Sequence, residues 1–529
     1  RGRANTWGPP EGHPSRLEEN AMARQGVLVE PYHRLKLEQV ERIHQASLAI
    51  LTDPGLMCFN RDAAEIFGDS GAEVLSIEQG GAACWLLKIP QKIISDAVQA
   101  APKVVRLGAR DDNNCLILDG REPRVCFASG SEANNWLDVD VEAFVSKRDP
   151  DTEVNLPVFR VEKGTLNRLA RAARLCEHLD SWDSFLRTVN IQDDDIVDDN
   201  KDVNKFFVSL NNTTKHVMSG LTELGQLSNV VRMAQIIAGG EDRLRENPVI
   251  SFITCIAKSP LQLTNDTTQK AIEIARLGIP LVISSSPQGG STAPIREEGM
   301  VAQINAEILG GIALSQLVNK GTPVLYGSVP ARADMVNLYD SYAVPEFSQY
   351  NIDCVQMARY YSLPCYSTGG VSDVKVPGIQ ASVERLFSHI LVTLAGPQYL
   401  HYAFGLLERT NTFCPVQAVL DDAHIDMVKR FVRQPTVSAD RISESLEQIR
   451  RVMGTSHKLY VRFVRSALRS GEIAPPYPFE GKDMADETLF RARERMEEIL
   501  SLPPLHIAEE VVDRVFQEVP GLVSRLRDR

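Results

Sequence analysis

The sequence has few cysteines, and they are not arranged as a disulfide framework or a metal site. Nine cysteines are spread over 529 residues, and no two of them form a Cys-X-X-Cys pair. Their odd number means that they cannot all pair with one another. These features disfavour a disulfide scaffold and a structural zinc cluster, and they favour a reducing compartment. We therefore expect a cytoplasmic protein that binds no metal.

Long apolar runs and excess positive charge are also missing. The most apolar stretch, 390–407, is interrupted by Gly396, Pro397 and His401, so we expect no membrane span. Residues 1–20 are polar and lack the apolar core of a signal peptide. The 57 Lys and Arg residues are outnumbered by 69 Asp and Glu, which disfavours nonspecific binding to nucleic acid or to an anionic membrane.

The pattern that is present is a regular alternation of short apolar runs and helical stretches. Such alternation predicts a parallel sheet covered by helices. Eight runs without a dinucleotide-binding fingerprint favour an α/β fold of the (β/α)8 (TIM) barrel type, with an open sheet as the alternative. The eight expected strands are Phe185–Asn190, His216–Leu221, Val249–Cys255, Pro280–Ser285, Pro323–Tyr326, Pro364–Ser367, Tyr399–Phe404 and Val416–Leu420.

Three parts of the chain are expected. Residues 1–160 read as helices and a small β meander packed on the barrel, residues 161–425 as the barrel core, and residues 426–529 as a helical extension. The hydrophobic content of 43% is sufficient for a core of this size.

Three loops with glycine are expected after consecutive strands, at the ends where (β/α)8 barrels bind ligands. The first loop carries Gly289, Gly290 and Ser291, the second Gly327, and the third Gly370. Glycine lets the backbone approach a ligand closely, although each pair is also typical of a plain turn. The first loop lacks the lysine of a Walker A motif, so it is weak support for phosphate binding.

Acid–base groups are sparse. The sequence contains no HExxH or GxSxG motif and no paired-histidine metal spacing. Three carboxylates fall near expected strand ends, Asp373, Glu408 and Asp421, and these are the candidate acids and bases. His216 and His401 lie inside strand runs and are interpreted as hydrogen-bonded core residues.

Aromatic residues also follow the expected strands. Tyr326, Phe347 and Tyr402 can line a pocket at the barrel mouth, and aromatic faces attract organic cations. Ordinary core packing is an equally good interpretation of the same residues.

Five segments in order resemble the trimethylamine methyltransferase family. They are SPQGGSTAP at 286–294, QINAEIL at 303–309, NKGTPVLYG at 319–327, ARYYSLP at 358–364 and SDVKVPGIQA at 372–381. Weaker similarity extends from about residue 35 to 510. The resemblance implies a (β/α)8 barrel that takes a methyl group from a methylated amine. The acceptor is the Co(I) of a separate corrinoid protein, so the corrinoid (cobalamin) is carried by the partner and this chain binds no cofactor.

The resemblance also bears on the substrate. Family members with pyrrolysine act on trimethylamine, and characterised members without it use quaternary amines such as glycine betaine. The pyrrolysine segment would fall near Thr368–Val371, where this sequence has standard residues. We therefore expect a quaternary (or tertiary) amine, and a homo-oligomer that contacts neither membrane nor nucleic acid. The alternatives are a trimethylamine enzyme with a hidden pyrrolysine, methyl transfer to a folate carrier, and a noncatalytic amine-binding barrel.

The expected site combines these residues. The substrate would contact Gln288, Gly289, Gly290, Ser291, Tyr326, Phe347, Ser367, Gly370 and Tyr402, with Asp373 and Glu408 as the catalytic carboxylates.

Overall fold

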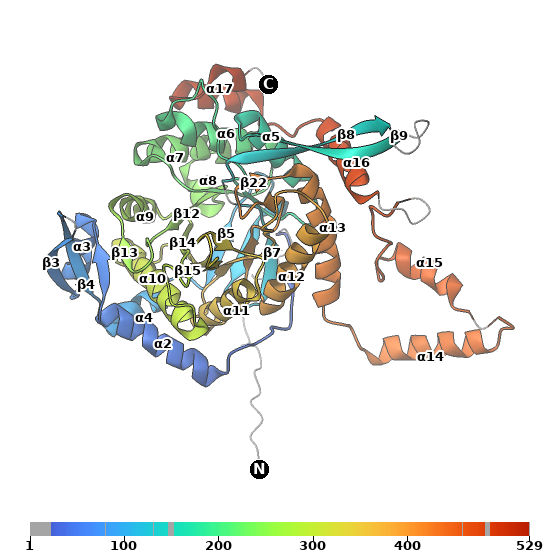
Figure 1. The fold of residues 1–529 in the computed structure, drawn as a ribbon, viewed down its shortest axis with the longest axis horizontal. Helices are drawn as coiled ribbons and strands as arrows, with labels where there is room; N and C mark the ends of the chain where they lie inside the picture. Colours follow the sequence, from blue (N-terminus) through green and yellow to red (C-terminus); the bar gives the residue numbers. More distant parts are fainter. Residues whose placement is uncertain are drawn as a thin grey trace, which may run out of the picture.

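Figure 1 shows the chain as a computed structural model, in which helices surround a central curled sheet. The structure describes residues 23–79, 81–130, 132–145, 153–457, 459–481 and 487–527. The polar segment in which no signal core was expected, residues 1–20, lies outside the described residues.

The central sheet has nine strands in the order β1-β7-β20-β19-β16-β14-β12-β11-β10. Neighbouring strands from β7 to β10 run parallel, and β1 at the edge runs antiparallel to β7. Parallel strands are buried on both faces, which explains runs such as Leu-Val-Ile-Ser-Ser in β14. The strands are β1(Val27–Leu28), β7(Arg124–Phe127), β10(Phe185–Leu186), β11(Val217–Ser219), β12(Ile250–Cys255), β14(Leu281–Ser285), β16(Val324–Ser328), β19(Cys365–Thr368) and β20(Tyr399–His401).

The sheet curls until the two ends of its parallel part meet. Ala128, directly after β7, forms an isolated parallel bridge with Ser184, directly before β10. The backbone N–H of Asp183 also donates to the carbonyl of Phe127 over 2.7 Å. The apolar residues packed together inside the curl include Cys126, Leu186, Met218, Val282, Leu325, Tyr366 and Tyr399.

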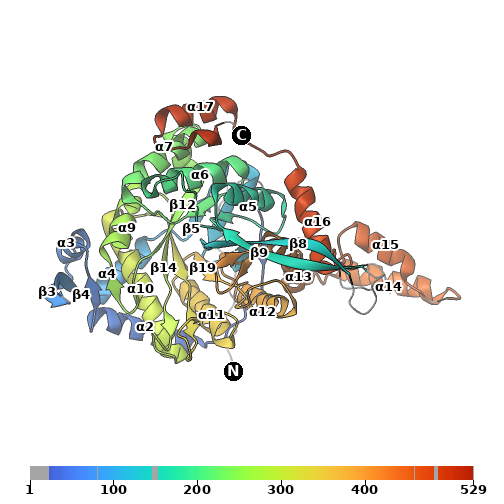
Figure 2. The same cartoon turned by 45° about the horizontal axis from the view of Figure 1, so that its top comes forward.

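A helix follows each parallel strand and packs outside the sheet (Figure 2). The expected alternation of strands and helices is therefore confirmed. These helices are α5(Leu166–His178), α6(Lys201–Asn212), α7(Leu227–Ala238), α8(Glu241–Glu246), α9(Asn265–Leu277), α10(Glu297–Val318), α11(Pro345–Tyr360), α12(Ile379–Ala395) and α13(Pro415–Val432).

One expected strand is wrong. Residues 416–420 belong to the first turns of helix α13, which begins at Pro415, a residue that favours the start of a helix. The missing parallel strand is β7, which the sequence interpretation had placed in the N-terminal meander. A boundary at residue 160 therefore does not separate the main sheet from what precedes it, because β7 pairs with β20. The rest of the three-part division stays a prediction.

Helix α10 is apolar on nearly every side because it is enclosed. It contacts α2, α4, α9 and α11 as well as the sheet. Its length and composition would allow it to cross a membrane, but 89% of its apolar window is buried inside the protein.

The antiparallel pair β5(Val104–Leu107) and β6(Leu116–Asp119) closes the N-terminal ends of the parallel strands. His216, just before β11, links this pair to the sheet. Its Nδ1 lies 2.7 Å from the carbonyl of Gly108, and its Nε2 lies 2.7 Å from the hydroxyl of Ser251. Burial lowers the pKa of His216 to about 4, so the ring is neutral at pH 7. The expectation of a hydrogen-bonded core histidine is confirmed here.

Three additions surround the central sheet. The first addition is a small sheet of β2, β3, β4 and β13, which lies beside α2, α3 and α4. The second is the β8–β9 hairpin, extended by β21 and β22. The third is a run of C-terminal helices. The bounds are β2(Leu56–Cys58), β3(Glu73–Gln79), β4(Ala82–Lys88), β13(Gln262–Leu263), α2(Leu37–Thr52), α3(Arg61–Asp69), α4(Gln91–Ala100), β8(Asn135–Val145), β9(Glu153–Lys163), β21(Leu406–Leu407), β22(Thr412–Phe413), α14(Ala439–Met453), α15(Val461–Arg469), α16(Thr488–Ser501) and α17(Glu509–Glu518).

The depressed pKa of His216 predicts acid sensitivity. The unfolded chain takes up a proton at this histidine near pH 6.5, whereas the folded protein does so only near pH 4. The stability linked to the neutral ring is complete above pH 6.5 and is lost as the pH falls, by roughly 2 to 3 kcal/mol between pH 6.5 and 4. Urea unfolding across this range measures the slope, which should be shallower in His216→Gln. An equal slope in the two proteins would contradict the assignment.

Candidate functional site

A pocket of about 420 Å³ lies where the C-terminal ends of the parallel strands converge. Residues at or just after β10, β12, β14, β19 and β20 line it, together with residues of α9. A small sheet of β15(Gln288–Gly289), β17(Ala331–Ala333) and β18(Asp340–Ser341) contributes another side. Its volume is typical of small-molecule sites. We call it the strand-end pocket.

Four aromatic rings line this pocket: Tyr342, Tyr366, His401 and Tyr402. The centroid of the His401 ring lies 3.9 Å from those of both Tyr366 and Tyr402, and Tyr342 meets Tyr402 edge-on at 6.4 Å. Burial raises the pKa of Tyr342 and Tyr366 well above the usual range and lowers that of His401 to about 3. These three groups are therefore uncharged at neutral pH.

The Tyr366 hydroxyl is a donor that the protein leaves unused. It is fully buried and has no hydrogen-bond partner within the part of the chain that the structure describes. A buried polar group without a partner costs about 1 to 3 kcal/mol, so a ligand or a water is expected to satisfy it. Tyr366 lines the strand-end pocket, but its hydroxyl oxygen has almost no accessible surface.

The charged residues of the lining are mostly acidic. They are the carboxylates Glu132, Asp266 and Asp340 and the ammonium of Lys270. The Lys270 ammonium donates to Asp266 over 2.6 Å, and Glu132 forms an ion pair with the buried Arg187 behind it. Asp340 accepts a hydrogen bond from the Gln288 amide over 2.6 Å, which is not a charged partner. A cation is therefore better matched to this lining than an anion.

Cysteines are distributed unevenly around the pocket. Cys255, at the end of β12, is exposed and lines it, whereas Cys365 on β19 is buried. The hydroxyls of Ser284 and Ser286 lie 3.4 Å and 3.7 Å from the Cys255 sulfur. Within the described ranges, no three His, Cys, Asp or Glu side chains are grouped as metal ligands.

A buried ion pair fixes the backbone that carries Tyr402. Arg385 on α12 donates through Nε to Asp421 on α13 over 2.7 Å, and both side chains are fully buried. Arg385 also donates to the carbonyls of Ala403 and Leu406, and Asp421 accepts from the N–H of Gly405 over 2.7 Å. Asp421 was a candidate acid or base from the sequence. Its contacts instead give it the role of holding this loop.

Several predicted site residues lie next to the pocket without lining it. Gln288 positions Asp340, and Phe347 packs edge-on against Tyr342 at 5.5 Å. Asp373 accepts hydrogen bonds from the backbone N–H groups of Tyr342 and Ala343 at 3.1 Å and 3.3 Å. Burial raises the pKa of Asp373, and these two N–H groups oppose that shift. These three side chains support the residues that face the pocket.

Two predicted residues, Tyr326 and Ser367, point outward from the sheet toward the surrounding helices and not into the pocket. The Tyr326 hydroxyl donates to Asn305 on α10 over 2.9 Å, and the Ser367 hydroxyl donates to Asn351 on α11 over 2.9 Å. Side chains alternate along a strand, so the neighbouring residues Leu325 and Tyr366 are the ones inside the curl.

The remaining predicted residues lie away from the lining. Glu408 accepts a hydrogen bond from Thr412 over 2.7 Å and forms an ion pair with Lys375 over 3.2 Å. Burial alone would raise the pKa of Glu408, but these two partners lower it below the usual value. A Cβ on Gly289 would contact the ring of Tyr350, Gly290 has a φ of +93°, and Ser291 is exposed. Of the predicted set, Tyr402 alone belongs to the pocket lining.

The segment 368–371 has no space for a long side chain. Gly370 has a φ of +96°, and a Cβ there would lie 2.1 Å from Nε2 of the buried His389. A Cβ on Gly369 would lie 3.2 Å from Leu400, and the Thr368 hydroxyl is already bonded to the carbonyl of Ser328. Val371 is buried against Phe347 and Tyr342.

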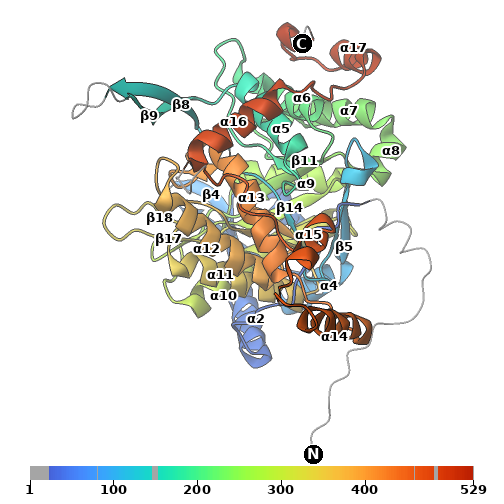
Figure 3. The ribbon, with the colours of Figure 1, turned by 90° about the vertical axis from the view of Figure 1, so that its right-hand side faces the viewer.

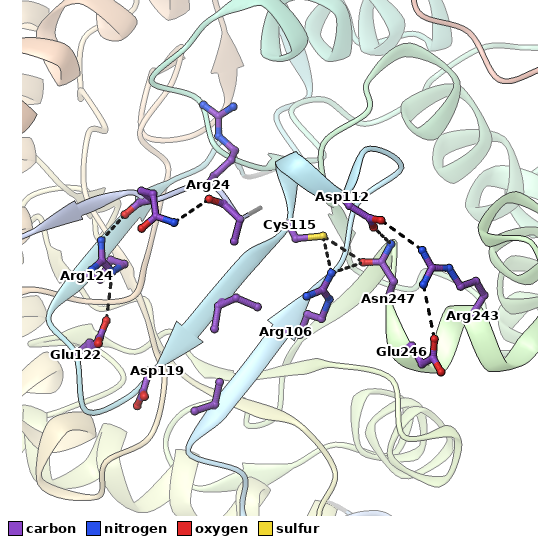
Figure 4. Close-up of a pocket in the computed structure, with 14 residues that line it drawn as sticks. Arg24, Arg106, Asp112, Cys115, Asp119, Glu122, Arg124, Arg243, Glu246 and Asn247 are labelled. Atoms are coloured by element: carbon purple, nitrogen blue, oxygen red, sulfur yellow. Dashed lines mark hydrogen bonds and ion pairs between the residues drawn. The ribbon is translucent and has the colours of Figure 1, made fainter. Parts of the chain in front are cut away.

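A second cavity, of about 720 Å³, lies at the opposite ends of the strands, beside β5 and β6 (Figure 4). Its charged residues are largely paired with one another: Arg124 with Glu122, and Arg243 with both Asp112 and Glu246. Although it is larger, it lies away from the strand ends where α/β folds place their ligands, so we assign the site to the strand-end pocket.

Comparison with known proteins agrees with the sequence resemblance. The family model described as trimethylamine methyltransferase (MTTB) matches residues 15–462. The chain belongs to the trimethylamine methyltransferase family. It is therefore an enzyme that transfers a methyl group, and the family supports a methylated amine as the donor.

Individual relatives carry two different substrate names. A trimethylamine methyltransferase of Desulfitobacterium hafniense (strain DSM 10664 / DCB-2) is 35% identical over 77% of this chain and 76% of its own length. That of Methanosarcina barkeri is 30% identical over 78% of this chain and 79% of its own. A glycine betaine methyltransferase of Desulfitobacterium hafniense (strain Y51) is 26% identical over 90% of this chain and 95% of its own.

The crowding at Gly370 gives a stability prediction. Gly370→Ala places a Cβ against His389 and forces an L side chain into a positive-φ conformation, so we expect a loss of at least about 2 kcal/mol of unfolding free energy. Gly225→Ala is the matched control, because nothing lies within 4 Å of its Cβ position. Denaturant unfolding compares the two variants, and equal stability would contradict the described geometry.

Proposed function

We propose that this protein moves a methyl group from a quaternary methylated amine, such as a betaine, to the Co(I) of a cognate corrinoid protein. The observation that carries the proposal is the strand-end pocket, in which neutral aromatic rings lie among carboxylates. The proposed enzyme is cytoplasmic and holds no corrinoid of its own.

We also propose that the curled sheet is a closed (β/α)8 barrel. Support comes from the parallel bridge between Ala128 and Ser184, which links the strands at the two ends of the parallel part. With that link, each of the eight parallel strands has two neighbours, and a helix follows each one. In such a barrel the strand-end pocket is the usual active-site position.

The pocket favours a cation that cannot donate hydrogen bonds. A quaternary ammonium has no N–H, so it gains from ring faces and from nearby negative charge rather than from hydrogen-bond acceptors. Contacts between cations and aromatic faces contribute about 0.5 to 2 kcal/mol each, and more where water is excluded. Tyr342 and Tyr402 supply the faces, and Asp340, which has no cationic hydrogen-bond partner among the described residues, supplies the charge.

The crowded segment 368–371 supports a quaternary rather than a tertiary donor. A quaternary ammonium leaves as a neutral amine after losing a methyl group and needs no proton. A tertiary amine is a much poorer donor unless it is first activated, which is the role attributed to pyrrolysine. The described backbone around Gly370 leaves no space for such a side chain.

The task of the protein residues is orientation. The reduced cobalt on the partner supplies the nucleophile for an in-line displacement at carbon. The rings of Tyr342 and Tyr402 would hold the ammonium with one methyl group facing the entrance, and burial of the pocket would exclude water.

A methyl-transfer assay with cob(I)alamin and a panel of amines tests the proposal. Glycine betaine and related quaternary amines should be demethylated, and trimethylamine should be inert. Robust turnover of trimethylamine alone would overturn the substrate class. Binding of quaternary amines without transfer to cob(I)alamin or to a corrinoid protein would instead favour the noncatalytic alternative, and transfer to a folate would favour the other carrier.

Tyr402 offers a residue-level prediction. Tyr402→Ala removes a ring face from the pocket, so we expect at least a tenfold weaker affinity for the substrate cation, whereas Tyr402→Phe keeps the face and should retain most of it. Tyr360→Ala, on the exposed end of α11, is the control. Calorimetric titration measures the affinities, and unchanged binding in Tyr402→Ala would exclude the ring from the site.

A further inference from the structure

Two helices near the C-terminus stand out from the rest of the molecule. After α13 ends at Val432, α14 and α15 extend away from its side, as Figures 1 and 2 show. Figure 3 views the molecule from the side on which they project. Within α14, Val452 is the one buried side chain. We call the described residues of 435–473 the arm.

The arm exposes an apolar seam of the kind that packs on another helix. On α14 the seam consists of Ile442, Leu446, Ile449 and Met453, each between 45% and 56% exposed. Their spacing of four, three and four residues places them on one face of the helix. On α15 the exposed residues Val461, Val464 and Leu468 follow the same three-and-four spacing. Monomeric proteins rarely leave such continuous apolar faces in water.

The same chain exposes a second apolar surface. Ile379, Val383 and Phe387 recur every four residues along the outside of α12, and Met427 and Phe431 do so on α13. Helices α12 and α13 contact each other, and we call these exposed side chains together the α12–α13 face.

We propose that the arm of one chain packs on the α12–α13 face of a second copy, and that the second arm returns the contact about a two-fold axis. Each of the two surfaces exposes on the order of 600 Å² of apolar side chain. A reciprocal exchange buries both on each chain, roughly 1,200 Å², which exceeds the about 800 Å² per partner of a typical stable interface.

A second copy is a better occupant than the corrinoid protein. The partner that receives the methyl group must face the strand-end pocket, at the C-terminal ends of the strands. Helix α13 starts on that side and has 18 residues, so the arm begins about 27 Å farther along its axis. The chain also supplies both complementary surfaces itself, as a closed two-fold contact requires.

Sedimentation velocity of the full chain tests the proposal. The wild type should sediment as a dimer, with twice the chain mass of 58.6 kDa, at micromolar concentration. Leu446→Glu with Ile449→Glu on the arm should raise the dimer dissociation constant at least a hundredfold. Val383→Glu with Phe431→Glu on the α12–α13 face should do the same. Val161→Glu, an exposed apolar residue of β9, is the control and should remain dimeric.

Each other outcome overturns the proposal. A wild type that is monomeric at 100 μM removes the dimer. If only the arm variant dissociates and the α12–α13 variant behaves like Val161→Glu, the arm does not pack on the α12–α13 face. Circular dichroism and thermal unfolding confirm that every variant is folded, which is expected because the substituted side chains are exposed.

Discussion

The pairing of every parallel strand with its neighbours is the constraint on which the rest of the structure depends. Because β7 and β10 meet through Ala128 and Ser184, the strand sheet curls and its C-terminal ends converge. Residues from distant parts of the sequence, such as Glu132 and Tyr402, are thereby brought to one pocket. At the opposite ends β5 and β6 pack on the inner side chains, so the strand-end pocket lies at the C-terminal side.

The convergence of the strand ends does not by itself fix the side chains of the pocket. Buried polar contacts hold the backbone that carries them. The Arg385–Asp421 pair holds the carbonyls and N–H groups of 403–406, directly after Tyr402, which has a φ of +66°. Such a conformation costs an L residue energy and persists where neighbouring contacts enforce it. Removing one partner would leave a buried charge unpaired, typically at a cost of about 3 to 5 kcal/mol. Loop geometry and stability are therefore linked through one ion pair.

The sequence alone predicted the alternation of strands and helices and the family, but it did not predict which side chains of a strand face the pocket. Seven of the expected strands overlap observed ones, because buried parallel strands read as short apolar runs. The run at 416–420 reads the same way but starts a buried helix, and β7 was hidden among antiparallel strands. Tyr326 and Ser367 were each one residue away from the inward position. Asp340 comes from the β17–β18 hairpin between β16 and α11, and Tyr342 directly follows this hairpin, which no strand-end pattern marks.

Burial also decides the charge of the pocket, which composition cannot show. Three ionisable groups of the aromatic wall are held neutral, Tyr342 and Tyr366 by raised pKa values and His401 by a pKa of about 3. The electrostatic character of the site then comes from the carboxylates around the wall. A protonated His401 would oppose a bound cation, and its low pKa prevents that throughout the physiological range. The aromatic wall therefore does not gain or lose a proton near neutral pH. Methyl loss from a quaternary ammonium also requires no proton, because the product leaves as a neutral amine, so such a reaction suits a wall of this kind.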